Sequence, residues 1–179
     1  MSSKYLVKGG KLANGQVADI AIVDGLITEV GPNLSLDGSL EVDAKNSVVI
    51  PGLVDLHTHL REPGKEDAET VLSGSLAAAK GGYVAVSAMA NTSPVADTAG
   101  VVEQVFRLGR EAGLVDVFPI GAVTKGLAGE DLADIGAMAD SQARVRVFSD
   151  DGNCVFDPLV MRRALEYVKK FDGVIAQHA

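Results

Sequence analysis

Short apolar runs separated by turn residues fill the first fifty positions of the chain. Gly, Asn and Asp separate four β-prone runs, at residues 5–8, 17–23, 26–30 and 48–50. The Asp24-Gly25 pair between two of these runs is typical of a hairpin turn. No segment of helix length shows a period of 3.6 residues in this part. We therefore expect residues 1–50 to form a small β-rich side domain.

Strand-like and helix-like patterns alternate from residue 51 onward. Apolar stripes at helical spacing predict helices at residues 67–80, 98–112, 131–139 and 157–170. Short apolar runs before and after them predict strands at residues 52–56, 83–89, 116–123, 144–148 and 174–176. Such alternation predicts an α/β fold with a parallel sheet and right-handed crossovers.

Two architectures fit this alternation: an open, doubly wound sheet and part of a (β/α)8 barrel. The chain has neither a G-x-G-x-x-G motif after a strand nor a G-x-x-x-x-G-K-[ST] motif. The nucleotide-binding versions of the open sheet therefore lose support.

Composition narrows the class of protein. The 179 residues are 47% hydrophobic and 22% charged, which is typical of a globular protein. Sixteen basic and 24 acidic residues give a net charge of −8, which disfavours a nucleic-acid binder. One cysteine, Cys154, excludes an intrachain disulfide framework and cysteine-rich zinc modules. Without an apolar run of about 18 residues or an N-terminal signal segment, we expect a cytoplasmic protein that binds no membrane.

Polar residues gather where the predicted strands end. His57, His59, Asn91, Asp151 and His178 each follow or end an apolar strand run. In a parallel α/β sheet the carboxyl ends of the strands lie on one edge, where ligands bind. All three histidines of the chain therefore lie on the predicted binding edge.

The His57-Thr58-His59 motif predicts a metal site. Residues i and i+2 of a strand face the same side, so the two imidazoles can bind one ion. A surface motif without a role is the alternative reading, and the placement of Asp and His at two further strand ends argues against it. Of the adjacent Asp150 and Asp151, at most one is expected to face the metal, although a plain turn is also typical of this sequence. With His178, this donor set is closer to part of a two-metal site than to one zinc site.

Two further strand-end residues are candidates for substrate binding. Arg61 offers a planar fork suited to a carboxylate, and Asn91 offers both a donor and an acceptor. Either could equally be a surface residue on spacing alone. Cys154 is more simply an incidental loop residue.

Four segments carry a family resemblance. Residues 51–64, Pro-Gly-Leu-Val-Asp-Leu-His-Thr-His-Leu-Arg-Glu-Pro-Gly, closely resemble the signature of dihydroorotases in the amidohydrolase superfamily. Residues 88–95 resemble the second-strand segment of that family, and residues 148–152 and 177–179 resemble two later metal-site segments. The resemblance extends over essentially the whole chain, including the β-rich start, which resembles half of a side sandwich.

The resemblance implies a metal-dependent hydrolase of the TIM-barrel type that interconverts N-carbamoyl-L-aspartate and L-dihydroorotate in de novo pyrimidine biosynthesis. It implies one or two Zn²⁺ ions, with His57 and His59 on the first and His178 on the second. Asp151 would be the metal-bridging carboxylate, as in the bacterial subgroup that has Asp where other relatives have a carboxylated lysine. Arg61 and Asn91 would hold the substrate carboxylate. Asp151 in that place weighs against hydantoinase-like and dihydropyrimidinase-like members.

The same resemblance implies that these residues are an incomplete site. The remaining histidine ligand and the catalytic aspartate of the family come from later strands, so we expect residues 51–179 to be the first half of a barrel, with about five strands. We expect the 179-residue chain alone to be inactive and to need the C-terminal half of the barrel. A homo-oligomer or aspartate transcarbamoylase are further expected partners. Two alternatives stay open: an allantoinase-like cyclic-amide hydrolase, and a non-catalytic truncated or partner-dependent module.

Overall fold

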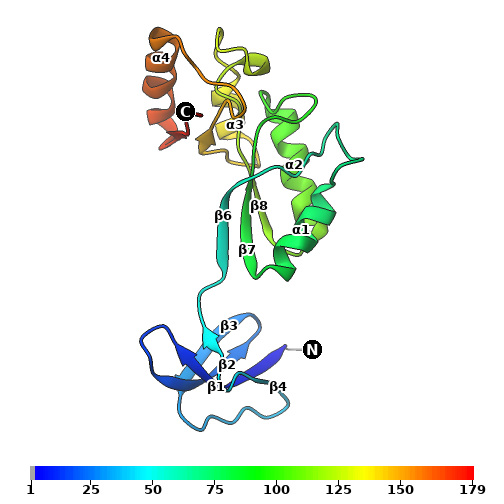
Figure 1. The fold of residues 1–179 in the computed structure, drawn as a ribbon, viewed down its shortest axis with the longest axis vertical. Helices are drawn as coiled ribbons and strands as arrows, with labels where there is room; N and C mark the ends of the chain where they lie inside the picture. Colours follow the sequence, from blue (N-terminus) through cyan, green and yellow to red (C-terminus); the bar gives the residue numbers. More distant parts are fainter. Residues whose placement is uncertain (1–2) are drawn as a thin grey trace. The chain divides into compact units, whose positions relative to one another are not determined.

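The computed structural model describes residues 3–179 and divides the chain into two compact units, residues 1–51 and 52–179 (Figure 1). The division falls next to the boundary expected after residue 50. Met1 and Ser2, which the predicted side domain includes, lie outside the described residues.

The first unit is a single sheet without a helix among its described residues. Its strands are β1 (Lys4–Leu12), β2 (Val17–Val23), β3 (Leu26–Gly31), β4 (Leu40–Asp43) and β5 (Val48–Val49). The order is β3-β2-β1-β4, and β5 also pairs with β1. The pairs β1–β2 and β2–β3 are antiparallel, whereas β4 and β5 run parallel to β1. The sequence pattern predicts the other four strands and misses β4, a four-residue segment with exposed side chains.

A buried carboxylate fixes the middle of this sheet. Asp19 of β2 accepts hydrogen bonds from Lys8 Nζ at 2.8 Å, from Gly9 N at 2.8 Å and from Leu34 N at 3.0 Å. The hydrogen bond from Lys8, followed by that from Gly9, lowers the pKa of Asp19 below its usual value. The carboxylate therefore ties β1, β2 and the loop after β3 together.

The second unit contains five parallel strands in sequence order. They are β6 (Leu53–Thr58), β7 (Tyr83–Ala88), β8 (Asp116–Pro119), β9 (Val147–Phe148) and β10 (Val174–Ile175). β6, β7 and β8 form one parallel sheet, β9 and β10 another, and a parallel bridge between Gly121 and Phe148 connects the two. A doubly wound sheet reverses its strand order at a switch point, whereas a barrel keeps sequence order. The observed order is that of the first five strands of a barrel.

Four α-helices connect these strands. They are α1 (Val71–Lys80), α2 (Ala99–Ala112), α3 (Ile135–Asp140) and α4 (Pro158–Val168), with short 3₁₀ turns η1 (Lys125–Leu127) and η2 (Lys169–Phe171). The predicted start of α1 at residue 67 is wrong, because the Thr70 side chain accepts a hydrogen bond from Ser73 N and begins the helix there. The predicted start of α3 at residue 131 is also four residues too early.

Two of the predicted strands, β8 and β9, are shorter than expected by three or four residues, and β7 and β10 are shorter by one residue each. β8 ends at Pro119 instead of residue 123, although Ile120 N still donates to Ala88 O at 2.8 Å. β9 contains only residues 147–148 of the expected 144–148, because Arg144 has a φ of +46° and closes a turn with Ser141. The β8 segment therefore continues past its last regular pair toward the carboxyl edge, whereas the residues missing from β9 precede that strand.

The helices pack on the strands through two apolar clusters. α1 and α2 lie side by side along β7 and β8 (Figure 1), where Val86, Val105 and Val117 are buried. At Gly109 of α2 the strand approaches so closely that a Cβ atom would lie 2.5 Å from the Cβ of Val117. The second cluster surrounds the fully buried Phe148 with side chains of α3 and α4.

The outer strands leave apolar surface exposed. Among the described residues, β6 pairs only with β7, and β10 pairs only with β9. Leu56 of β6 is 74% exposed, and Val54 and Phe118 are also exposed. Unpaired outer strands and exposed apolar side chains are what an unclosed barrel presents.

Candidate metal centre

Strand ends bring four potential ligands together. His57 lies near the end of β6, and His59 follows that strand directly. Asp151 lies three residues beyond β9, and His178 lies three residues beyond β10. Parallel strands therefore carry these side chains to one edge, as their positions at the ends of apolar runs predict.

Three ligand atoms form a nearly equilateral triangle. The Nε2 atoms of His57 and His59 lie 3.2 Å apart, and each lies 3.4 Å from Oδ2 of Asp151. A tetrahedral ion with bond lengths of about 2.05 Å holds its ligand atoms about 3.3 Å apart. The donor types and their spacing therefore fit a divalent metal ion, and these three residues form a candidate metal-binding group.

The two oxygens of Asp151 face different histidines. Oδ2 faces His57 and His59, whereas Oδ1 accepts a hydrogen bond from Nδ1 of His178 at 3.1 Å. Asp151 is only 6% exposed, so its carboxylate depends on these partners. Asp151 therefore contacts all three histidines of the chain, with one oxygen toward His57 and His59 and the other toward His178.

Asn91 contacts the histidine pair directly. The Oδ1 atom of Asn91, three residues beyond β7, lies 2.9 Å from Nδ1 of His59. Because Oδ1 can only accept, Nδ1 carries the proton and Nε2 keeps its lone pair for a metal. The amide nitrogen of Asn91 donates to no described residue, so it stays available to a ligand. The sequence indicates Asn91 only as a candidate for substrate binding and gives no sign of its contact with His59.

Asp150 points away from the histidines. It is 1% exposed and accepts hydrogen bonds from Val123 N at 2.8 Å and Thr124 N at 3.0 Å, as well as from the Thr124 hydroxyl. Of the two adjacent aspartates, only Asp151 faces the cluster. Nothing in the local sequence identifies Thr124 as a partner, because it precedes Asp150 by 26 residues.

Arg61 lies in the loop after β6, beside the loop that carries Asn91. It has a φ of +61°, and its guanidinium forms no hydrogen bond or ion pair with a described residue. At Gly64 the two loops pack so tightly that a Cβ atom would lie 2.0 Å from Ser93 O. The loops that carry Arg61 and Asn91 therefore adjoin.

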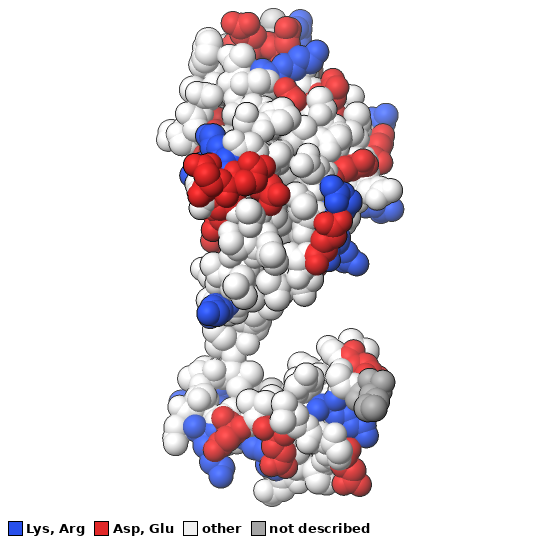
Figure 2. Space-filling model, turned by 90° about the vertical axis from the view of Figure 1, so that its right-hand side faces the viewer, with Lys and Arg blue, Asp and Glu red and all other residues white. Residues whose placement is uncertain are grey.

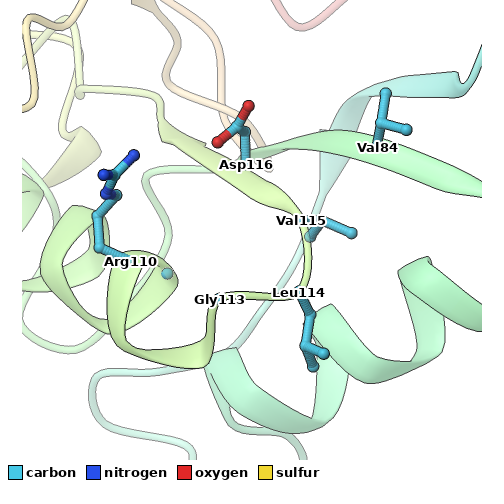
Figure 3. A pocket seen from close by; sticks show the side chains of 7 residues that line it. Val84, Arg110, Gly113, Leu114, Val115 and Asp116 are labelled. Carbon is cyan, nitrogen blue, oxygen red and sulfur yellow. The ribbon is translucent and has the colours of Figure 1, made fainter. Parts of the chain in front are cut away.

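A cavity of about 250 Å³ opens onto the cluster. Its lining includes His57, Asp151 and His178, together with the neighbouring residues Met89, Ser149, Ala176, Gln177 and Ala179. A larger cavity of about 370 Å³ lies at the opposite, amino end of the strands, where α2 ends and β8 begins. Figure 3 shows Arg110, Asp116 and Val84 around it, and no histidine or cysteine lines it. Of these two cavities, the one at the carboxyl edge is lined by His57, Asp151 and His178.

The surface carries charges of both signs. On the face drawn in Figure 2, Lys and Arg side chains occur singly or in small groups among acidic ones. None of the helices in residues 3–179 combines the length and apolar composition needed to cross a membrane.

Comparison with known proteins gives consistent matches. The family described as "Dihydro-orotase-like" matches residues 46–179. The chain is 66% identical to a dihydroorotase of Leifsonia xyli over 98% of its length and 40% of that protein. It is 64% identical to a dihydroorotase of Streptomyces coelicolor and 53% identical to one of Mycobacterium tuberculosis, over 41% of each.

Solved structures agree on the fold. The L-hydantoinase of Arthrobacter aurescens superposes with a TM-score of 0.80 at 21% identity, over 100% of this chain and 41% of that one. The chain spans about 40% of the length of the curated relatives that it matches. The match of the family over residues 46–179 and the identities of 53 to 66% over nearly the whole chain show that the chain belongs to the dihydro-orotase-like family.

Proposed function

We propose that the protein containing this chain is a zinc-dependent cyclic amidase that interconverts N-carbamoyl-L-aspartate and L-dihydroorotate. The observation that carries the proposal is the triangle of His57, His59 and Asp151 at the carboxyl edge of the strands. Identities of 53 to 66% to proteins named dihydroorotase support the choice of reaction. The proposal includes a role in pyrimidine synthesis and a cytoplasmic setting.

The residues of the chain have distinct roles in this proposal. His57, His59 and Asp151 would hold one zinc ion, and Asp151 and His178 would contribute to a second. Zinc bound there would acidify a water molecule and polarise the ring amide carbonyl. Asn91 keeps His59 in the tautomer whose Nε2 atom is free to bind.

Substrate orientation is assigned to the two adjoining loops. Arg61, whose guanidinium has no partner among the described residues, would pair with the substrate carboxylate. The free amide nitrogen of Asn91 would donate to the same group. Fixing the anion at two points reduces the entropic cost of reaching the reactive geometry.

The proposal includes a requirement for more chain than these 179 residues. The curated relatives are considerably longer, and β6 and β10 each have an unpaired side among the described residues. Further strands would close the barrel and supply the remaining ligand and the general acid/base. Residues 1–51 would belong to a side sandwich, and residues 52–179 to the first half of the barrel.

The direct test is hydrolysis of L-dihydroorotate by the protein expressed from its complete gene. We expect turnover in both directions, loss of activity after treatment with a chelator, and recovery on adding zinc. The same assay on residues 1–179 alone should give no turnover. Hydrolysis of allantoin without hydrolysis of dihydroorotate would instead favour an allantoinase, and equal activity with and without bound metal would contradict the proposal.

A further inference from the structure

Asp150 is a buried acidic residue without a role in the proposed chemistry. It adjoins Asp151, and the side chains of the two residues leave the backbone in opposite directions. We propose that Asp150 and Thr124 form a positioning pair that holds Asp151 in its metal-binding orientation. This inference rests on the metal centre of the proposed function, but not on the identity of the substrate.

The Asp150 carboxylate is held by three donors of one short segment. Val123 N and Thr124 N both donate to Oδ1, and the Thr124 hydroxyl donates to Oδ2. All these atoms are buried, and hydrogen bonds to a carboxylate are stronger in a buried environment than in water. The side chain therefore has a single orientation, determined by residues 123–124.

Thr124 is itself anchored away from the histidines. Its Oγ1 atom accepts a hydrogen bond from Gly129 N at 2.8 Å, and its backbone bridges to Leu132. The segment before it is joined to β9, because Ser149 N donates to Gly121 O at 2.8 Å. The pair therefore connects the loop after β8 to the end of β9.

Fixing Asp150 restricts Asp151 through the backbone that they share. The backbone before Asp150 is held because Ser149 N donates to Gly121 O. The backbone after it is held because Asp150 O accepts from Asn153 N at 2.9 Å. With the Asp150 side chain also bonded, little freedom remains for a rotation that would turn Asp151 away from His57 and His59. The function of the pair is to keep Oδ2 of Asp151 at the distance that a metal ion requires.

A buried carboxylate with three donors can also serve stability alone, and the chain contains a matched example. Asp19, in the unit of residues 1–51, is 6% exposed and likewise accepts three hydrogen bonds. The same Asp→Asn change replaces one acceptor oxygen by a donor nitrogen there too, in a sheet that carries no metal-centre residue. Asp19→Asn is therefore the control for a purely structural loss.

The experiment measures the zinc dissociation constant of the complete protein by competition with a chromogenic chelator. The variants are Asp150→Asn, Thr124→Val, Thr124→Ser and Asp19→Asn, and the melting temperature of each metal-free protein is recorded alongside. We expect Asp150→Asn and Thr124→Val to raise the dissociation constant by about 10- to 100-fold. Thr124→Ser should keep the wild-type affinity because it retains the hydroxyl, and Asp19→Asn should lower only the melting temperature.

Two results would overturn the inference. One is an unchanged zinc affinity in Thr124→Val and Asp150→Asn with a loss of melting temperature like that of Asp19→Asn. The other is an equal loss of affinity in Thr124→Ser and Thr124→Val, since the hydroxyl would then have no role. If Asp150→Asn fails to fold, the comparison of the two Thr124 variants decides the question. A wild-type protein that binds zinc without hydrolysing dihydroorotate would refute the proposed function but leave this comparison intact.

Discussion

The Oδ1 atom of Asn91 lies 2.9 Å from Nδ1 of His59 and so selects the ring nitrogen that can bind a metal. The amide nitrogen of the same side chain remains free for a substrate. In the proposed function Asn91 therefore has two roles that substitution can separate.

Asn91→Ala and Asn91→Asp are expected to differ in metal binding. The alanine variant loses the acceptor for His59, and its zinc affinity should fall about 10- to 100-fold. The aspartate variant keeps an acceptor oxygen and should retain zinc, but it places a negative charge beside the substrate carboxylate and should raise KM. Zinc titration together with steady-state kinetics checks both, and equal zinc affinity in the two variants would contradict the contact.

Arg61 is expected to act on substrate binding without affecting the metal. A hydrogen bond to a charged group is worth about 1.5 to 3 kcal/mol, so Arg61→Gln should lower kcat/KM about 10- to 150-fold. Arg61→Lys keeps the charge but not the planar fork, and it should recover only part of this loss. Zinc content should stay at the wild-type level in both variants. Loss of zinc in parallel with activity would show that Arg61 supports the metal centre instead.

Two glycines of α2 offer a matched test of helix packing. A Cβ atom at Gly109 would lie 2.5 Å from Val117 Cβ, so Gly109→Ala should force α2 away from β8 and cost about 1 to 3 kcal/mol of unfolding free energy. At Gly100 nothing lies within 4 Å of the added atom, and Gly100→Ala should be neutral or stabilise by up to about 1 kcal/mol. Denaturant unfolding of both variants measures the difference. Equal effects would contradict the close approach of α2 to β8.

Asp19 is expected to contribute to the acid sensitivity of the first unit. The pKa of Asp19 is lowered in the folded protein. Its stabilising effect is therefore complete above the pKa of about 3.9 that an aspartate has in an unfolded chain. The effect is lost as the pH falls through the lower folded value, because the carboxylate must then be protonated. Asp19→Asn should reduce the unfolding free energy near neutral pH and flatten its decline in acid. If the free energy of unfolding in urea has the same pH dependence in Asp19→Asn as in the wild type, the contact of Asp19 with Lys8 does not contribute to stability.

The sequence alone predicts most of the architecture and the histidine pair of the candidate metal centre. Alternating strand and helix patterns give the five strands in order, and the spacing of His57 and His59 places both imidazoles on one side of β6. These features are predictable because they depend on local periodicity. The resemblance and the spacing favour Asp151 over Asp150 as the residue at the metal, and in the structure Asp151 faces the histidines while Asp150 accepts from Val123 N.

Features that depend on contacts between residues far apart in the sequence cannot be predicted from local patterns. β4 is a short, exposed segment that becomes a strand only because β1 offers an edge to pair with. The contacts of Asn91 with His59 and of Asp150 with Thr124 join residues 32 and 26 positions apart. No local pattern records such pairs, since they exist only after the strands have assembled.

In the proposed function, hydrolysis depends on a metal centre that His57, His59 and Asp151 form together. The most direct measurement is a zinc titration of the metal-free complete protein that follows bound zinc and dihydroorotate hydrolysis in the same samples, alongside His57→Ala. We predict that activity rises in proportion to bound zinc in the wild type, and that His57→Ala binds zinc weakly and stays inactive. Wild-type zinc content and turnover in His57→Ala would contradict the assignment of His57 to this metal centre.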